Sequence, residues 1–154
     1  MPIALPNRNL PLLLLRAREG VMAQFRWILN QHGLTEQQWR VVRALLENDS
    51  MEPRQICETC QLLSPSLAGV LSRMEEMGLV KRKRMQTDQR RVLVSITPKS
   101  RALARKMAPL IEAQYAELQS ALGAELLTET YEVIDRLLAR LAEMPGPAGV
   151  ADAG

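Results

Sequence analysis

The chain has 154 residues, of which 47% are apolar and only 3% aromatic, and its formal net charge is +3. This length suits one domain, or one domain with an extension, whose core is built mainly from Leu, Val, Met and Ala. No run of apolar residues reaches the roughly 18 that cross a bilayer, and the stretch LPLLLL near the start lacks a secretory cleavage pattern, so we expect a cytoplasmic protein.

The first regular element is predicted between about Asn9 and Gln31, after a loose arm formed by residues 1–8. Apolar side chains recur in this segment at steps of three and four residues, which is the period of an amphipathic helix. We therefore expect one long helix that ends near Gly33. Its apolar positions are Leu14, Val21, Met22, Phe25, Ile28 and Leu29.

The segment LTEQQW predicts the start of a second helix. Thr35 is a favourable N-cap, and Gln38 three residues later completes the pattern of a capping box. Leu34 and Trp39 have the spacing of a hydrophobic staple across the same helix end. The second helix is therefore expected over about residues 36–47.

A short helix, PRQICETC, follows, and then a further helix within SPSLAGVLSRMEEMG. We expect Ser64 to cap the second of them, Pro65 to lie in its first turn and Gly78 to end it in a left-handed conformation. One face of this helix is predicted to be apolar, with Leu67, Val70, Leu71, Met74 and Met77. The opposite face has little bulk near its start, so another surface can approach its backbone closely; it carries Pro65, Ser66, Gly69, Ser72 and Arg73.

After Gly78 the sequence pattern changes to a period of two, which predicts a β-hairpin with a polar QTDQ tip. Thr97 and Pro98 then predict the start of a helix, Pro109 is expected to kink it, and Gly123 ends it. A last helix has apolar residues at three- and four-residue spacing. They are Leu127, Tyr131, Ile134, Leu138 and Leu141.

Positive charge is concentrated in and after the predicted hairpin. Ten Lys and Arg residues lie between Leu79 and Lys106, and Asp88 is the single acidic residue among them. A local field of this kind is typical of a surface that binds a polyanion.

The predicted order of elements is α-α-α-α-β-β-α-α, which is the order of a winged helix-turn-helix with additional helices at both ends. The fold class is therefore mainly α with a small β-hairpin wing. We expect a dimerisation helix over 9–33, a DNA-binding winged helix-turn-helix over 34–97, dimerisation helices over 98–144 and a disordered tail over 145–154. The terminal helices are too apolar to stand alone, and a second copy of the chain would cover them.

Three segments of the sequence resemble the MarR family of dimeric transcriptional regulators: LTEQQWRVVRAL, SLAGVLSRMEEMGLVKR and TDQRRVLVSIT. In the last segment Asp88 and Arg90 match the family's D-x-R wing signature, and Ile96-Thr97 stands for its closing Leu-Thr. The resemblance covers about Arg16 to Leu141 and is greatest for repressors of homoprotocatechuate degradation and for nicotinate-catabolism regulators. One departure is Gln61-Leu62-Leu63, where the family's helix-turn-helix commonly has a glycine.

The resemblance implies a homodimeric repressor that binds double-stranded DNA at a palindromic operator. Arg90 would enter the minor groove, with Asp88 holding its guanidinium; alternatively, Asp88 only shapes the turn. The helix over about 65–77 would lie in the major groove. The candidate DNA-binding residues are Ser64, Ser66, Ser72, Arg73, Arg84, Asp88, Arg90 and Arg91. Alternatively, Ser64 is only a cap, Ser66 only a first-turn residue and Arg73 only a surface cation.

The family also implies an effector, a small aromatic acid such as a hydroxyphenylacetate or a pyridine carboxylate, which would release the repressor of an aromatic-acid catabolic operon. The candidate ligand-binding residues are Arg16, Phe25, His32, Trp39, Arg40 and Arg43, since rings suit aromatic side chains and a carboxylate suits a guanidinium. Other roles are open for several of them. His32 could be a helix-end cation, Trp39 the staple residue, and the arginines of the second helix could be exposed or paired between domains.

Cys57 and Cys60 form a C-x-x-C pair on the short helix. A zinc site needs further ligands at suitable spacing, and the single histidine is far away in the sequence, so we expect no metal and no cofactor. We expect the two thiols to pack in the core, with a redox-sensing repressor as the alternative.

The lack of a phosphate-binding glycine loop or a nucleophile–base set argues against an enzyme. A helical interaction module that does not bind DNA, or an architectural DNA-binding protein, remain competing interpretations.

Overall fold

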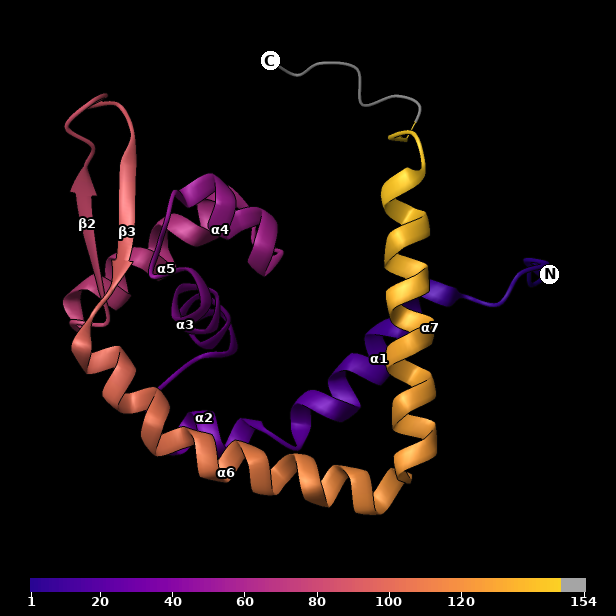
Figure 1. Cartoon of the computed structure of the whole chain (residues 1–154). Coiled ribbons are helices and arrows are strands. Elements are labelled where there is room, and N and C mark those ends of the chain that lie inside the picture. The colour runs from indigo at the N-terminus through magenta and orange to yellow at the C-terminus, as the bar shows by residue number, and fades with distance from the viewer. Residues whose placement is uncertain (148–154) are drawn as a thin grey trace. The chain divides into compact units, whose positions relative to one another are not determined.

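A computed structural model describes residues 1–147 of the chain (Figure 1). The chain forms two compact units, residues 1–114 and residues 115–154, and helix α6 crosses the boundary between them. In chain order the elements are α1 (Leu10–Ala23), α2 (Arg26–Gln31), α3 (Glu36–Asn48), β1 (Ser50–Met51), α4 (Pro53–Cys60), α5 (Ser64–Glu76), β2 (Val80–Arg84), β3 (Val92–Ile96), α6 (Pro98–Leu122) and α7 (Ala124–Glu143).

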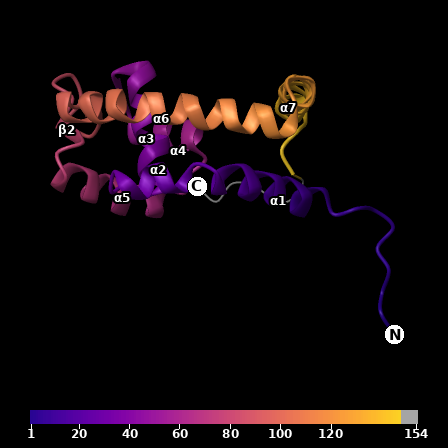
Figure 2. The same ribbon diagram turned by 90° about the horizontal axis from the view of Figure 1, so that it is seen from below.

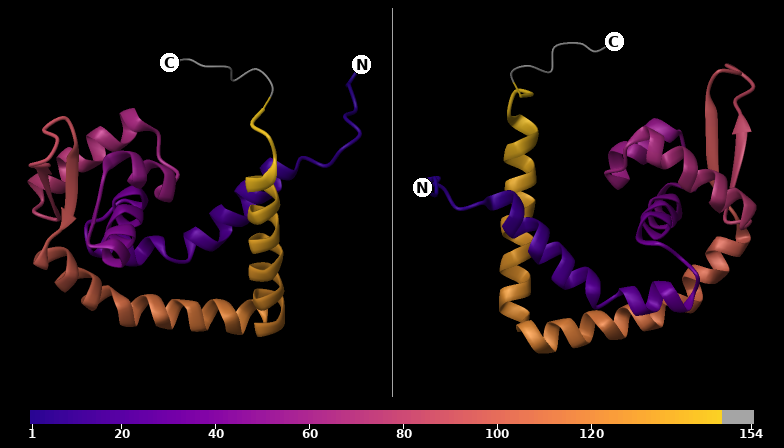
Figure 3. Two further views of the ribbon diagram at one scale, coloured as in Figure 1. Left: turned by 45° about the horizontal axis from the view of Figure 1, so that its top comes forward. Right: turned by 180° about the vertical axis from the view of Figure 1, so that it is seen from behind.

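The prediction of one long first helix was wrong, because the segment forms α1 and α2 with a break between them (Figure 3). At the break the backbone N–H groups of Gln24 and Phe25 donate to carbonyls three residues earlier, at 3.1 and 3.0 Å. This tighter turn ends the α-helical register. As a result Phe25, Ile28 and Leu29 are buried, whereas the side chains of α1 are exposed or half-buried.

The predicted capping box of α3 is confirmed. The backbone N–H of Gln38 donates to the Thr35 hydroxyl at 3.1 Å, and the Thr35 N–H donates to the Gln38 side-chain oxygen at 3.0 Å. The helix buries one face against α4, α5 and the sheet. Val41, Leu45, Ile56 and Met74 are fully buried and form part of this core.

The helix-turn-helix pair consists of α4 and α5. Gln61 ends α4 in a left-handed conformation, φ 52° and ψ 53°, so a non-glycine residue takes the conformation that the family's glycine favours. The N-cap of α5 is Leu63, so the prediction that Ser64 caps this helix was wrong; Ser64 is its first residue. Gly78 lies after the end of α5 with φ +73°, as predicted.

The β-hairpin is confirmed, with β2 and β3 antiparallel from the pair Val80–Ile96 to the pair Arg84–Val92. A third strand, β1, was not predicted; it pairs with β3 at Ser95 and Val94, giving the order β1-β3-β2. With two residues, β1 is too short to show a period in the sequence. The base of the hairpin is therefore part of a small sheet.

Helix α6 runs from Pro98 to Leu122 with Pro109 inside it, and its first half belongs to unit 1. Thr97 is confirmed as the residue at its start: its hydroxyl accepts from the Ser100 N–H at 3.3 Å and donates to the Gly78 carbonyl at 2.7 Å. Helix α2 lies alongside α6 (Figure 2), and the indole N–H of Trp27 in α2 donates to Gln114 of α6 at 3.0 Å. The sheet and α2 are thus both tied to this helix.

Unit 2 contains the end of α6 and helix α7, separated by Gly123 with φ +89°, as predicted. The side chains of α7 are exposed or half-buried, and its apolar stripe is open: Tyr131 is 54% exposed, Leu138 59% and Leu141 51%. Of the predicted disordered tail, residues 148–154 lie outside the described residues. Within residues 1–147, no helix combines the length and apolar character of a bilayer span.

Candidate nucleic-acid interface and regulatory residues

Helix α5 presents a face of short side chains to solvent. Leu67, Leu71 and Met74 hold the helix on the core, and the residues on the other side, Ser66, Gly69, Ser72 and Arg73, are exposed as predicted. A shallow hollow of about 370 Å³ lies between this face and the start of α3. Its lining residues are Thr35, Gln37, Gln38, Pro65, Ser66, Gly69, Val70 and Arg73. Apart from Pro65, Gly69 and Val70, the lining residues carry hydrogen-bonding side chains, one of them a cation, which suits a phosphate or a base edge.

The tip of the wing carries Arg90, whose side chain is 96% exposed. The Asp88 carboxylate accepts a hydrogen bond from the backbone N–H of Arg90 at 3.0 Å, whereas the two side chains are 4.0 Å apart, too far for a hydrogen bond. Asp88 therefore shapes the turn, and it faces the Arg90 guanidinium as an ion pair without the expected hydrogen bond.

The other wing arginines have partners within the chain. Arg84 donates to the Gln89 carbonyl across the wing tip at 2.7 Å. Arg91, predicted to face DNA, forms an ion pair with Glu52 at the start of α4. This hydrogen bond raises the pKa of Arg91 further above its usual value. Its charge is thus shared with a carboxylate of the protein. Ser64, the remaining candidate in this group, is exposed, and its hydroxyl lies 3.8 Å from the Cys57 sulfur.

Arg40 has a structural role in the described chain. Its Nη1 atom donates to the Cys60 carbonyl at 2.7 Å and is 3.5 Å from that of Gln61, both at the end of α4. Arg43, one turn further along α3, is exposed. Of the two candidates on this helix, Arg43 is therefore the more accessible for a carboxylate ligand.

The remaining ligand candidates lie on different elements of unit 1. Phe25 is buried at the break before α2, Trp39 is half-buried on α3, and Arg16 is exposed on α1. His32 follows the last residue of α2, and its Nδ1 is 2.7 Å from the Ile28 carbonyl, which agrees with its alternative interpretation as a helix-end residue.

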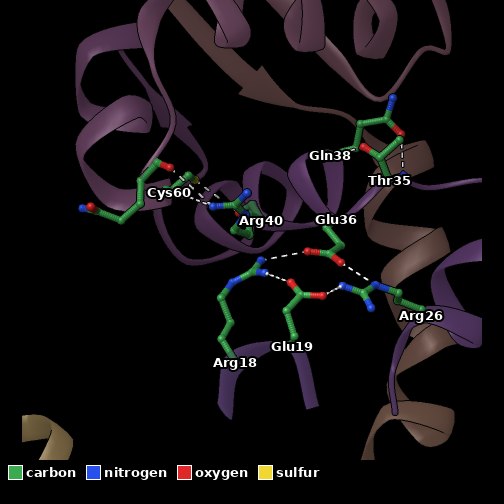
Figure 4. A network of polar contacts seen from close by, with 9 residues as sticks. Arg18, Glu19, Arg26, Thr35, Glu36, Gln38, Arg40 and Cys60 are labelled. Carbon is green, nitrogen blue, oxygen red and sulfur yellow. Dashed lines mark hydrogen bonds and ion pairs between the residues drawn. The ribbon is translucent and has the colours of Figure 1, made fainter. Parts of the chain in front are cut away.

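Sequence reasoning missed a closed ring of four charges that joins α1, α2 and the start of α3 (Figure 4). Arg18 binds Glu19 and Glu36, each at 2.8 Å, while Arg26 binds the same two carboxylates at 2.6 and 2.7 Å. Burial acts to raise the pKa of Glu36, but the hydrogen bonds from the two arginines outweigh it and the pKa is lowered. The members are up to 18 residues apart, so no spacing rule could have paired them.

The structure supports core packing for one of the two thiols. Cys60 is 4% exposed, its thiol donates to the Arg40 carbonyl at 3.4 Å, and burial raises its pKa (Figure 4). Cys57 is half-buried, and both cysteines are free in the described chain. Within residues 1–147, no group of His, Cys, Asp and Glu side chains is arranged to hold a metal ion.

Comparison with known proteins identifies the family to which the chain belongs. Residues 23–107 match the family described as transcriptional regulator SarA/Rot. The homoprotocatechuate degradative operon repressor of Escherichia coli is 37% identical over 142 residues, which cover 90% of this chain and 96% of the repressor. The chain belongs to the MarR family of transcriptional regulators. The resemblance inferred from the sequence is thereby confirmed.

Two solved structures support the same assignment at the level of the fold. The transcriptional regulator PA4135 is 42% identical with a TM-score of 0.83, over 86% of this chain and 98% of its own. NadR in complex with 4-hydroxyphenylacetate is 35% identical with a TM-score of 0.76, over 94% of this chain and all of its own. The winged-helix prediction is therefore confirmed, and this MarR-family chain has regulators as relatives rather than enzymes.

Proposed function

We propose that this MarR-family chain is a homodimeric repressor of an aromatic-acid catabolic operon, released from a palindromic operator by a small aromatic carboxylate. The observation that carries the proposal is the combination, in one unit, of an exposed helix face with short side chains and a cationic hairpin. The name of the E. coli repressor and the 4-hydroxyphenylacetate bound to NadR support the chemical class of the effector.

In this proposal α5 lies in the major groove. Ser66, Ser72 and Arg73 contact bases or phosphates there, and Ser64, at the start of α5, lies close to the DNA backbone. The wing carries Arg90 into the adjacent minor groove, where a narrow A·T-rich segment attracts a guanidinium. Arg84 adds cationic charge beside it, and Asp88 acts through the shape of the turn.

A second copy of the chain covers the apolar surfaces of the terminal helices. The exposed side chains of α7 form a stripe with helical spacing, and α1 adds a further set of exposed leucines. Burying such surface is the dominant favourable contribution to association. The exposed apolar residues include Leu10, Leu12, Leu14 and Leu15 on α1, and Tyr131, Ile134, Leu138 and Leu141 on α7.

For the effector, we propose that a phenyl or pyridine ring packs near Trp39 and Phe25 and that Arg43 binds the carboxylate. Arg40 supports this site by fixing α3 to α4. Arg16 and His32 are secondary candidates, since they lie on the neighbouring α1 and at the end of α2. Release requires that the acid bind the DNA-free state more tightly than the DNA-bound state.

The test is a footprint on the DNA upstream of the chain's own gene, with and without a panel of hydroxyphenylacetates and pyridine carboxylates. We expect a palindromic protected site, and its loss with an acid such as 4-hydroxyphenylacetate. The matched control is 4-hydroxyphenylacetamide, which has the same ring and no charge and should leave the footprint intact. Protection that no aromatic acid relieves would contradict the effector class; no protection at low salt would contradict the function itself.

A further inference from the structure

Two carboxylates outside the wing hold arginines of the wing. Glu75, near the end of α5, accepts two bonds from Arg82 of β2: Nε to Oε2 at 3.1 Å and Nη2 to Oε1 at 3.3 Å. Glu52, the N-cap of α4, binds Arg91 just before β3 and also accepts from the first turn of α4. Each strand of the wing is therefore tied to one helix of the helix-turn-helix.

The wing needs such ties because its sheet is small. Strand β1 pairs with Ser95 and Val94, close to the base of the hairpin, and the tip over residues 83–92 extends beyond this three-stranded part. A two-stranded ribbon by itself is marginally stable and twists easily. Contacts to α4 and α5 are thus well placed to set the direction in which the tip points.

We propose that Glu75 and Glu52 are positioning residues for DNA recognition. They fix the wing relative to α5, so that Arg90 and the exposed face of α5 reach one duplex together. Arg82 and Arg91 are then anchors of the wing rather than phosphate contacts. The inference rests on the proposed DNA-binding function.

The sign of one substitution separates this role from simple electrostatics. Removing an acidic charge near a DNA-binding surface should tighten binding, because the acid repels phosphates. Glu75→Gln should instead weaken binding to the footprinted duplex by about two- to fivefold, the range expected for an exposed ion pair. The matched control is Glu76→Gln, since Glu76 is the next residue, is exposed and makes no ion pair within residues 1–147. It should leave binding unchanged or tighter.

A double-mutant cycle tests whether Glu75 acts through the wing. Arg90→Ala should cost less affinity in the Glu75→Gln background than in the wild type, because a displaced tip no longer places Arg90 in the groove. The same cycle with Glu76→Gln should be additive. Glu52→Gln retains an oxygen that can cap α4, so it tests the second tie without removing the cap. Thermal unfolding of every variant serves as the control that each is folded at the assay temperature.

The dependence of affinity on salt supplies an independent readout. Losing one cation that neutralises DNA charge lowers the magnitude of the slope of log K against log salt by roughly 0.9. We expect this loss for Arg90→Gln, and no further loss when Arg82→Gln is added to Arg90→Gln, because Arg82 acts through the placement of Arg90. Additive cycles, or a further loss of slope on adding Arg82→Gln, would overturn the inference while the wild type still binds. Failure of the proposed function has a different signature, namely a wild type that binds no duplex.

Discussion

Arg40 and Cys60 bind each other at two points. The Arg40 guanidinium donates to the Cys60 carbonyl at 2.7 Å, and the Cys60 thiol donates to the Arg40 carbonyl at 3.4 Å. Arg40 lies within α3 and Cys60 ends α4, so the reciprocal pair joins two helices through residues that are 20 positions apart in the chain. The pair fixes the end of the first helix of the helix-turn-helix, at the point where the chain turns toward α5.

Arg40→Met should destabilise the chain by about 1.5–3 kcal/mol, because it leaves the carbonyl at the end of α4 without its charged donor. The Nε of Arg40 is buried and lacks a hydrogen-bond partner within the described residues, which places the expected loss toward the lower end of that range. Urea unfolding measures the change. Arg43→Met is the control on the same helix; as an exposed substitution it should stay within about 0.5 kcal/mol of the wild type. Equal effects of the two substitutions would show that the reciprocal pair contributes nothing.

The two cysteines should react with thiol reagents at different rates. Burial raises the pKa of the Cys60 thiol, and its hydrogen is donated to a carbonyl, whereas Cys57 is half-buried. Thiolate and access both govern reactivity, so a maleimide reagent should label Cys57 first in the folded protein. Mass spectrometry of a time course gives the order, with Cys57→Ser and Cys60→Ser as the two single-thiol controls. Labelling in the opposite order would mean that Cys60 is open to solvent.

The ring of four charges should make stability fall at acid pH. Because the pKa of Glu36 is lower in the folded chain than its ordinary value of 4.5, its stabilising effect is complete above that value and is lost as pH falls through the folded pKa. The difference in unfolding free energy between wild type and Glu36→Gln should therefore be largest near neutral pH and shrink below about pH 4.5. High salt should reduce the same difference.

The control for that experiment is Glu47→Gln, since Glu47 is exposed near the other end of α3 and makes no ion pair within residues 1–147. Its unfolding free energy should follow that of the wild type across the acid range. A Glu36→Gln variant that also followed the wild type at every pH would show that the ring does not stabilise the fold.

The open stripe of α7 predicts the effect of a single charge on assembly. Leu138→Glu should shift the protein toward monomers in sedimentation experiments, because it places a carboxylate in the apolar surface that a second copy would bury. Arg136→Glu introduces the same side chain on the opposite face of the helix and should leave the assembly unchanged. Loss of dimers with Arg136→Glu, or their survival with Leu138→Glu, would place the interface elsewhere.

Features with a local cause could be predicted from the sequence. Thr35 and Gln38 cap α3 through groups three residues apart, and Gly78 and Gly123 adopt positive φ where the sequence predicted helix ends. The exposed face of α5 followed from the helical period. The cap of α5 was placed one residue late, at Ser64 instead of Leu63, which is the usual uncertainty of a helix end.

Features that depend on tertiary structure could not be predicted. The break between α1 and α2 contains neither proline nor glycine, so no residue there signals the end of a helix. Phe25 also fits the helical period of the segments on both sides of the break. Glu52 and Arg91 are 39 residues apart, and their contact exists only once the wing lies beside α4. The same holds for Arg40, whose partners at the end of α4 turn a candidate for ligand binding into a structural residue.

Gly69 has a consequence for how such regulators change over time. A Cβ atom there would meet nothing within 4 Å, so the fold itself has room for a larger residue, and glycine inside a helix is about 1 kcal/mol less favourable than alanine. Substitutions can thus add side chains to the exposed face of α5 without changing the packing of the core. In the proposed complex, in which this surface faces DNA, duplicated copies of the gene would acquire separate target sites by single substitutions, without first having to rebuild the scaffold.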